Sequence, residues 1–148
     1  MDLWRISRHH DLSGEGGRLA PARWNSGGDP VVYLAACPPG ALIEILVHLE
    51  IKERTAPMSY TLFQISTPLE MRIVTLAAPE GEAWKTDETS TRSAGDAWLK
   101  SNASALAQVP SAILPETFNY LLNPLHPDAA RVKIAEVYAA VLDGRLGR

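Results

Sequence analysis

The chain has 148 residues, of which 46% are hydrophobic and 21% are charged, with a formal net charge of −3. A chain of this length fits one domain, residues 1–148, with a sizeable core, and the composition is typical of a soluble globular protein. The acidic balance argues against nucleic-acid binding, which relies on a basic face. It leaves room for a small anionic ligand, since one or two arginines suffice to bind one.

No run of residues approaches the roughly 20 apolar residues that a membrane span requires. The first residues, Met1–Arg5, lack the basic and apolar regions of a secretory signal peptide. The single cysteine, Cys37, has no partner for a disulfide within the chain. We therefore expect a cytoplasmic protein that makes no contact with a membrane.

The first half of the chain predicts two strands and a helix. Leu3–Ser7 and the β-branched run Val31–Ala35 predict strands, the second one buried. The glycine-rich stretch Ser13–Gly17 predicts a flexible loop, and Asn25–Pro30 contains turn residues. Two prolines and a glycine predict a helix from about residue 38 to Ile51, since proline is favoured in a first helical turn.

The second half predicts further strands around one helix. Apolar runs predict strands at Ser59–Ser66 and Met71–Leu76, and a helix is expected at Ser93–Asn102. The remaining segments are a polar, exposed loop at Pro79–Thr91, a strand at Val109–Leu114 broken by Pro110, a short apolar run at Phe118–Asn123, and a strand or short helix at Val132–Leu142. Strands and helices do not alternate regularly, so we expect an α+β fold. No Gly-x-Gly-x-x-Gly motif is present, which argues against a Rossmann mode of dinucleotide binding.

Glu44 is the most informative single residue. The helix predicted around it is apolar on nearly every side, which is typical of a buried helix. On a helical wheel, Glu44 lies beside Ala41, Val47 and His48, and a buried carboxylate must be paired or face a cavity. Two interpretations stay open: a structural role, as an ion pair or at a solvent-exposed helix edge, and a functional carboxylate.

Three further residues are candidates on weaker grounds. Arg23, next to Trp24 in a loop, suits bidentate contact with a phosphate above the indole, although the motif alone favours a surface arginine lying over a tryptophan. Tyr33 at the centre of an aliphatic strand is otherwise a core tyrosine. A buried serine such as Ser111 more often satisfies local backbone groups than reacts.

Metal-ligand spacing is absent from the sequence. His9, His10 and His126 do not form a His-x-x-x-His pattern, and no Cys-x-x-Cys pair occurs. Ser111 also lacks the Gly-x-Ser-x-Gly elbow of α/β-hydrolases. We therefore expect no metal.

Taken in order, six blocks of sequence resemble the RES domain family, which is named for an arginine, a glutamate and a serine. The blocks are Ala22-Arg23-Trp24-Asn25, Pro30-Val31-Val32-Tyr33-Leu34-Ala35, Ala41-Leu42-Ile43-Glu44-Ile45-Leu46-Val47-His48-Leu49, Gly95-Asp96-Ala97-Trp98, Val109-Pro110-Ser111-Ala112 and Asn119-Tyr120-Leu121-Leu122-Asn123-Pro124-Leu125-His126-Pro127. They extend over most of the chain, and their order is far more specific than any one block.

The resemblance implies an ADP-ribosyltransferase-like fold of small mixed or antiparallel sheets flanked by helices. It also implies a toxin that consumes NAD and an Xre-like antitoxin that occludes its active site. The family's arginine, tyrosine, glutamate and serine fall on Arg23, Tyr33, Glu44 and Ser111.

Each of these residues then has an expected role. Glu44 stabilises the cationic ribose centre that forms when the nicotinamide–ribose bond breaks. Arg23 binds the pyrophosphate, Tyr33 packs against the nicotinamide, and Ser111 positions the ribose or the amide. The remaining NAD-binding candidates, which we expect to line the pocket, are Trp24, His48 and Asn119.

The expected function is the toxin of a type II toxin–antitoxin system that transfers ADP-ribose from NAD to a protein. The alternative is an NAD glycohydrolase or phosphorylase that depletes NAD without a protein target, because both reactions share the bond-breaking step. A non-catalytic nucleotide sensor and an RNA-cleaving toxin are the other hypotheses, and the acidic balance disfavours the second. Neither general acid nor metal is required, since nicotinamide leaves as a neutral molecule.

Overall fold

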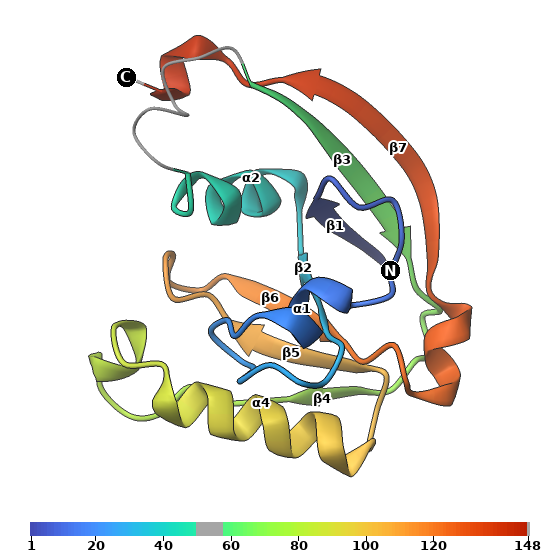
Figure 1. Cartoon of the computed structure of the whole chain (residues 1–148), viewed down its shortest axis with the longest axis vertical. Helices are drawn as coiled ribbons and strands as arrows, with labels where there is room; N and C mark the ends of the chain where they lie inside the picture. Colours follow the sequence, from blue (N-terminus) through green and yellow to red (C-terminus); the bar gives the residue numbers. More distant parts are fainter. Residues whose placement is uncertain (50–57, 148) are drawn as a thin grey trace.

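The computed structural model of the chain describes residues 1–49 and 58–147, which form one mixed sheet flanked by helices (Figure 1). The strands are β1 (Asp2–Ile6), β2 (Val32–Ala35), β3 (Ser59–Ser66), β4 (Ile73–Thr75), β5 (Leu106–Pro110), β6 (Phe118–Leu122) and β7 (Lys133–Val141). The helices are α1 (Glu15–Leu19), α2 (Pro38–Leu46) and α4 (Thr89–Ser101), with the 3-10 helices η1 (Ala83–Lys85), η2 (Pro127–Arg131) and η3 (Gly144–Gly147).

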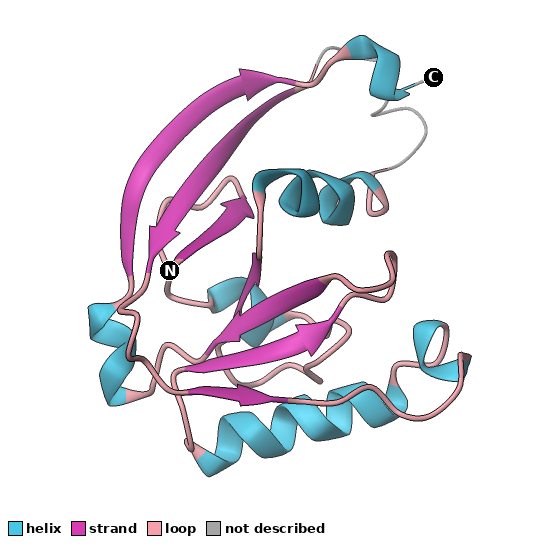
Figure 2. Ribbon diagram, turned by 180° about the vertical axis from the view of Figure 1, so that it is seen from behind, coloured by secondary structure: helices cyan, strands magenta, loops and turns pink. Residues whose placement is uncertain are grey.

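The seven strands run in the order β4-β5-β6-β2-β1-β3-β7. Neighbouring strands are antiparallel except for β4 and β5, which are parallel. Figures 1 and 2 show β3 and β7 as a curved arm at the end of the molecule opposite α4. The α+β class expected from the sequence is confirmed, and the strands join in a single sheet because β1 pairs with both β2 and β3.

Most strand predictions are confirmed. Leu3–Ser7 and Val31–Ala35 match β1 and β2 to within one residue, and Ser59–Ser66 is β3. Of Met71–Leu76, the central residues form β4. The segment for which strand and helix stayed open, Val132–Leu142, forms β7, and the apolar run from Phe118 forms β6.

Two predictions in the strand and loop regions are wrong in their bounds. Ser13–Gly17 is expected to be a loop, but α1 begins at Glu15. The strand expected at Val109–Leu114 starts at Leu106 and ends at Pro110. Alanine has a low strand propensity, so Ala107 conceals the buried start of this strand. Proline is tolerated at the strand's last position, where its missing N–H interrupts no further pairing.

The prediction of an exposed loop at Pro79–Thr91 is wrong in part, although most of the segment is exposed. This segment contains η1, whose Trp84 is 7% exposed, and α4 begins within it at Thr89 rather than at Ser93. The first turns of α4 carry small polar side chains, so they show no apolar periodicity in the sequence. Of these side chains, Thr91 is buried, and its hydroxyl donates to the carbonyl of Arg23 in the loop before β2.

The helix around Glu44 is shorter and more exposed than expected. It ends at Leu46, and the predicted end at Ile51 lies outside the described residues. Of its residues, Gly40 and Ala41 are buried, and the following Val47 is 50% exposed. The expectation of a helix buried all round is therefore wrong, because α2 packs on β1 and β2 along one side and borders an open cleft along another.

Two apolar clusters cover opposite faces of the sheet, as side-chain alternation along the strands requires. On one face, the main strand residues are Leu3, Val32, Leu34, Phe63, Ile65, Leu106 and Leu122. On the other face, Val31, Ala107, Val109 and Leu121 pack with Trp24 and with Trp98 and Leu99 of α4. Tyr33 packs against the second cluster, so α4 and the strand carrying Tyr33 share one core. Among the described residues, no helix is long and apolar enough to cross a membrane.

Gly95 sets how closely α4 approaches the loop before β2. A Cβ atom at this position would lie 1.7 Å from the carbonyl oxygen of Trp24, which is far inside any van der Waals contact. The side chain of Trp24 is 2% exposed and packs in the same cluster as Trp98. Glycine is therefore required here for contact between helix and loop.

Replacing Gly95 with alanine should lower the free energy of unfolding by about 3 kcal/mol, because loop and helix must move apart. Gly16→Ala in α1 is the matched control, since a Cβ atom there meets nothing within 4 Å. We expect the control to remain within about 1 kcal/mol of the original protein. Urea denaturation followed by circular dichroism measures both, and equal stabilities of the two variants would contradict the packing argument.

Candidate functional site

A cleft of about 590 Å³ opens between α2, the loop before β2, the start of α4 and the β5–β6 connection. It brings together residues that are far apart in the sequence. Six of the seven residues singled out from the sequence line it: Arg23, Trp24, Tyr33, Glu44, His48 and Asn119. The seventh, Ser111, contacts Glu44 directly.

The floor of the cleft is a row of residues in register across four strands. Trp4 on β1 pairs with Ala35 on β2, which pairs with Asn119 on β6, which pairs with Val109 on β5. Directly opposed residues share a face, so all four side chains point into the same side of the sheet. This register places Asn119 at the centre of the floor, beneath α2.

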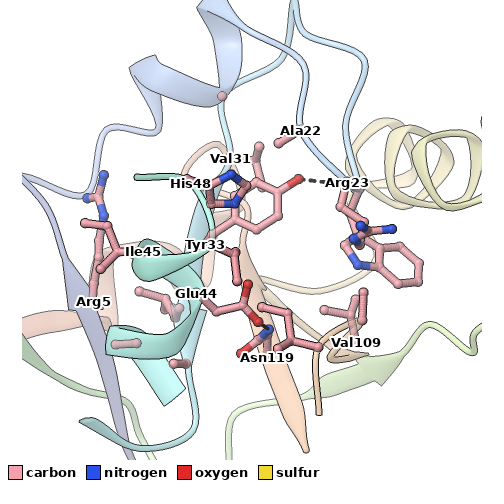
Figure 3. Close-up of a pocket in the computed structure, with 18 of the residues that line it drawn as sticks. Arg5, Ala22, Arg23, Val31, Tyr33, Glu44, Ile45, His48, Val109 and Asn119 are labelled. Carbon is pink, nitrogen blue, oxygen red and sulfur yellow. Dashed lines mark hydrogen bonds between the residues drawn. The ribbon is translucent and has the colours of Figure 1, made fainter. Parts of the chain in front are cut away.

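The Glu44 carboxylate is held by two side chains, of which Figure 3 shows Asn119. The Asn119 amide donates a hydrogen bond of 2.6 Å to Glu44 Oε1, and the Ser111 hydroxyl donates a longer one of 3.3 Å to the same oxygen. Ser111 Oγ in turn accepts from the backbone N–H groups of Ile113 and Leu114. The carboxylate is thus oriented by neutral donors, without a cationic partner among the described residues.

Tyr33 joins the sheet to the loop before β2. Its hydroxyl donates a 2.7 Å hydrogen bond to Asn25 Oδ1 and accepts one of 3.0 Å from the backbone N–H of Trp24. The Asn25 amide donates to the carbonyls of Gly17 and Ala20. Burial raises the pKa of the Tyr33 hydroxyl far above its ordinary value. The hydroxyl therefore stays protonated as a structural donor, and the ring lines the cleft.

Arg23 is positioned by the segment that the sequence suggested was an exposed loop. Its guanidinium donates to the carbonyls of Trp84 (2.8 Å) and Lys85 (3.0 Å) and lies 3.6 Å from Glu88 Oε1. The indole against it is that of Trp84, whose ring centroid lies 5.8 Å away. The expectation that Trp24 lies beneath this guanidinium is wrong, because the Trp24 indole is buried in the core below α4.

The start of α4 fixes the backbone of the same loop. Thr91 Oγ1 donates to the carbonyl of Arg23 at 2.6 Å. Arg92 Nε donates to the carbonyl of Ala22 at 2.8 Å, and the backbone N–H of Ser26 donates to Asp96 at 2.9 Å. We call residues 22–26 the arginine loop. Side chains of α4 hold this loop on one side, and Tyr33 holds it on the other.

Sequence reasoning missed Trp84, Glu88 and Arg92. Glu88 and Arg92 also line the cleft, and they form an ion pair of 2.6 Å at an (i, i+4) spacing. This spacing is a helix signal. The polar composition around this pair concealed the start of α4, although the spacing itself is visible in the sequence.

No group of three or more His, Cys, Asp or Glu side chains within residues 1–49 and 58–147 has the arrangement of a metal site. The expectation that the protein uses no metal stays a prediction.

The cleft has the features of a small-ligand binding site on a rigid scaffold. Apolar and aromatic side chains form its walls, and a few polar groups converge at fixed positions, as in enzyme pockets. A carboxylate and an arginine lie on different walls, so the site suits a polar ligand with an anionic part. These features define a pocket suited to a small ligand in an α+β domain.

The RES domain family matches residues 2–143 of the chain. The chain is 45% identical to Toxin Res of Pseudomonas putida over 134 residues, which cover 90% of this chain and 92% of that relative. It is 34% identical to the Prs ADP-ribosylating toxin of Sphingobium sp. (strain YBL2), covering 99% of this chain and 96% of that protein. The chain therefore belongs to the RES domain family, which confirms the resemblance drawn from its six sequence blocks.

A solved structure shares the fold. A chain in the crystal structure of the M. tuberculosis MbcT–MbcA toxin–antitoxin complex aligns with a TM-score of 0.72 at 19% sequence identity. The alignment covers 99% of this chain and 86% of that chain. The arrangement of strands and helices is thus that of a known fold, although most residues differ.

Replacing Tyr33 with phenylalanine should lower the free energy of unfolding by about 1–3 kcal/mol. The change leaves the buried Asn25 Oδ1 and the Trp24 N–H without this partner, and unsatisfied buried polar groups are destabilising by that amount. Tyr138→Phe is the control, since Tyr138 is 45% exposed and its hydroxyl lies 3.4 Å from Gln64. Thermal denaturation compares the two, and an equal effect of both substitutions would contradict the role of Tyr33.

Proposed function

We propose that this chain is the toxin of a toxin–antitoxin pair and that it cleaves the nicotinamide–ribose bond of NAD, transferring ADP-ribose to a protein. The observation that carries the proposal is the Glu44 carboxylate, held by Asn119 and Ser111 and facing a cleft that also contains Arg23. Membership of a family whose relatives are named toxins supports it.

Glu44 supplies the electrostatic part of the reaction. The bond between ribose C1′ and the pyridinium nitrogen breaks, and its electron pair neutralises the departing nicotinamide. The ribose carbon becomes oxocarbenium-like, and a carboxylate beside it stabilises that charge, as in glycoside hydrolysis. The acceptor then bonds to C1′ and loses its proton to water. Glu44 suits this role because its neutral donors leave its negative charge in place.

The other residues bind and orient the substrate. Arg23 binds the diphosphate, since its guanidinium is fixed by the Trp84 and Lys85 carbonyls and carries further N–H donors. The Tyr33 ring packs against the nicotinamide. His48 and Asn119 line the pocket at the glutamate, whereas the buried Trp24 contributes to the cleft wall from the core below α4. Ser111 is not among the residues that line the cleft, so we assign it the orientation of Glu44.

A protein acceptor is the first choice because one relative, 34% identical over 99% of this chain, is named an ADP-ribosylating toxin. Water and phosphate are the alternative acceptors, which would make the chain an NAD glycohydrolase or phosphorylase. NAD is the substrate in each case, and we propose that the reaction takes place in the cytoplasm without a metal.

We further propose an Xre-like antitoxin that occludes the cleft. The fold is shared with a chain of a toxin–antitoxin complex. The rim of the cleft carries exposed Val47 and His48, which offer a partner both apolar and polar contact next to Glu44.

Glu44→Gln tests the proposal. Loss of the carboxylate charge should reduce NAD consumption by about 100-fold or more, the usual effect of removing one transition-state electrostatic contact. Glu116→Gln, in the exposed β5–β6 connection, is the control and should retain activity. Nicotinamide release is measured by mass spectrometry, and circular dichroism verifies that each variant is folded. Equal activity of E44Q and the original protein would refute the assigned role.

The acceptor is identified in a separate experiment. Purified protein incubated with NAD labelled in the ADP-ribose half and with cell lysate should produce a labelled protein band. Labelled ADP-ribose without labelled protein would indicate hydrolysis, and labelled ADP-ribose phosphate without labelled protein would indicate phosphorolysis. Either result would contradict transfer to a protein.

A further inference from the structure

A second arginine lies beside Arg23 in the cleft. Arg92 projects from the first turns of α4, and both arginines line the cleft together with Glu88. Glu88 Oε1 lies 3.6 Å from Arg23 Nη2, and Glu88 Oε2 lies 2.6 Å from Arg92 Nη2. One carboxylate group thus holds two guanidinium groups side by side.

The two guanidinium groups retain donors for a ligand. Arg92 uses Nε for the Ala22 carbonyl and Nη2 for Glu88. Arg23 uses Nη1 and Nη2 for the carbonyls of Trp84 and Lys85. Within the part of the chain that the structure describes, Arg92 Nη1 and Arg23 Nε have no hydrogen-bond partner. Their side chains are 35% and 25% exposed, so neither group is sealed from the cleft.

The charges of this cluster also favour an anion. Two arginines and one glutamate leave a net charge of +1 on one wall of the cleft. Guanidinium N–H groups donate strong hydrogen bonds to phosphate oxygens, so two neighbouring guanidinium groups with one unpartnered nitrogen each match two phosphate groups joined by a bridging oxygen. An ion pair that only stabilised the helix would require one arginine, whereas Glu88 contacts both Arg23 and Arg92.

We propose that Arg92 and Arg23 together form a two-arginine site for the diphosphate of the dinucleotide, with Glu88 as the carboxylate that holds them in place. The inference rests on the proposed function, in which Arg23 alone binds the diphosphate, and deepens it. Arg92 is then a substrate-binding residue rather than solely a brace for the arginine loop.

The test compares Arg92→Gln with Arg18→Gln. Arg18 also forms an ion pair with a nearby glutamate, Glu15, but it does not line the cleft, so it controls for loss of one charge and one ion pair. Glutamine at position 92 can still donate to the Ala22 carbonyl. The probe is ADP-ribose, which contains the diphosphate, and its dissociation constant is measured by calorimetry.

The proposal predicts that R92Q raises the dissociation constant of ADP-ribose by about 10-fold or more, the effect of losing a hydrogen bond to a charged group. R18Q should change it less than twofold. For NAD cleavage, R92Q should raise KM and leave kcat within about threefold, because uniform binding is lost. A lowered kcat with unchanged ADP-ribose affinity would show that Arg92 only supports the arginine loop, and would overturn the proposal.

A second, more conservative variant distinguishes a loss of ligand contacts from misfolding. Arg92→Lys keeps the positive charge and a donor for the Ala22 carbonyl but loses the planar fork. It should bind ADP-ribose more weakly than the original protein and more tightly than R92Q, and unchanged affinity in both variants overturns the proposal. Absence of ADP-ribose binding by the original protein also overturns it. Arg92-dependent binding without any NAD cleavage would retain this site and refute the proposed function instead.

Discussion

The site depends on the contact between the start of α4 and the arginine loop. Along the loop, successive residues are held by α4: the carbonyls of Ala22 and Arg23 accept side-chain hydrogen bonds, the Trp24 carbonyl packs on Gly95, and the Ser26 N–H donates to Asp96. Tyr33 fixes the loop from the sheet. A loop with few internal bonds thus becomes rigid enough to hold Arg23 at one wall of the cleft.

The opposite wall is built by different means. Glu44 stands on α2, and its orientation comes from Asn119 on β6 and from Ser111 in the connection that follows β5. Both donors are close to it because β2, β6 and β5 pair in register. The two walls are therefore independent hydrogen-bonded units on one sheet. Substrate binding would require both.

Sequence patterns predicted most of the strands and the start of α2. Glu44 was informative because a carboxylate on an apolar helix needs a partner. The family resemblance marked Asn119 and Ser111 as site residues but not as hydrogen-bond partners of Glu44, since strand register is a long-range property. The partners of Arg23 were missed because the segment with Trp84 is polar apart from that residue. Its burial comes from packing against the arginine loop, which no local pattern encodes.

We propose that NAD lies between the two walls, with its nicotinamide ribose at Glu44 and its diphosphate at Arg23. The most direct measurement of this placement is a crystal structure of the Glu44→Gln variant with NAD. We expect ribose C1′ beside the side chain of residue 44 and the diphosphate in contact with the Arg23 guanidinium. A dinucleotide bound elsewhere, or with its nicotinamide ribose remote from residue 44, would contradict it.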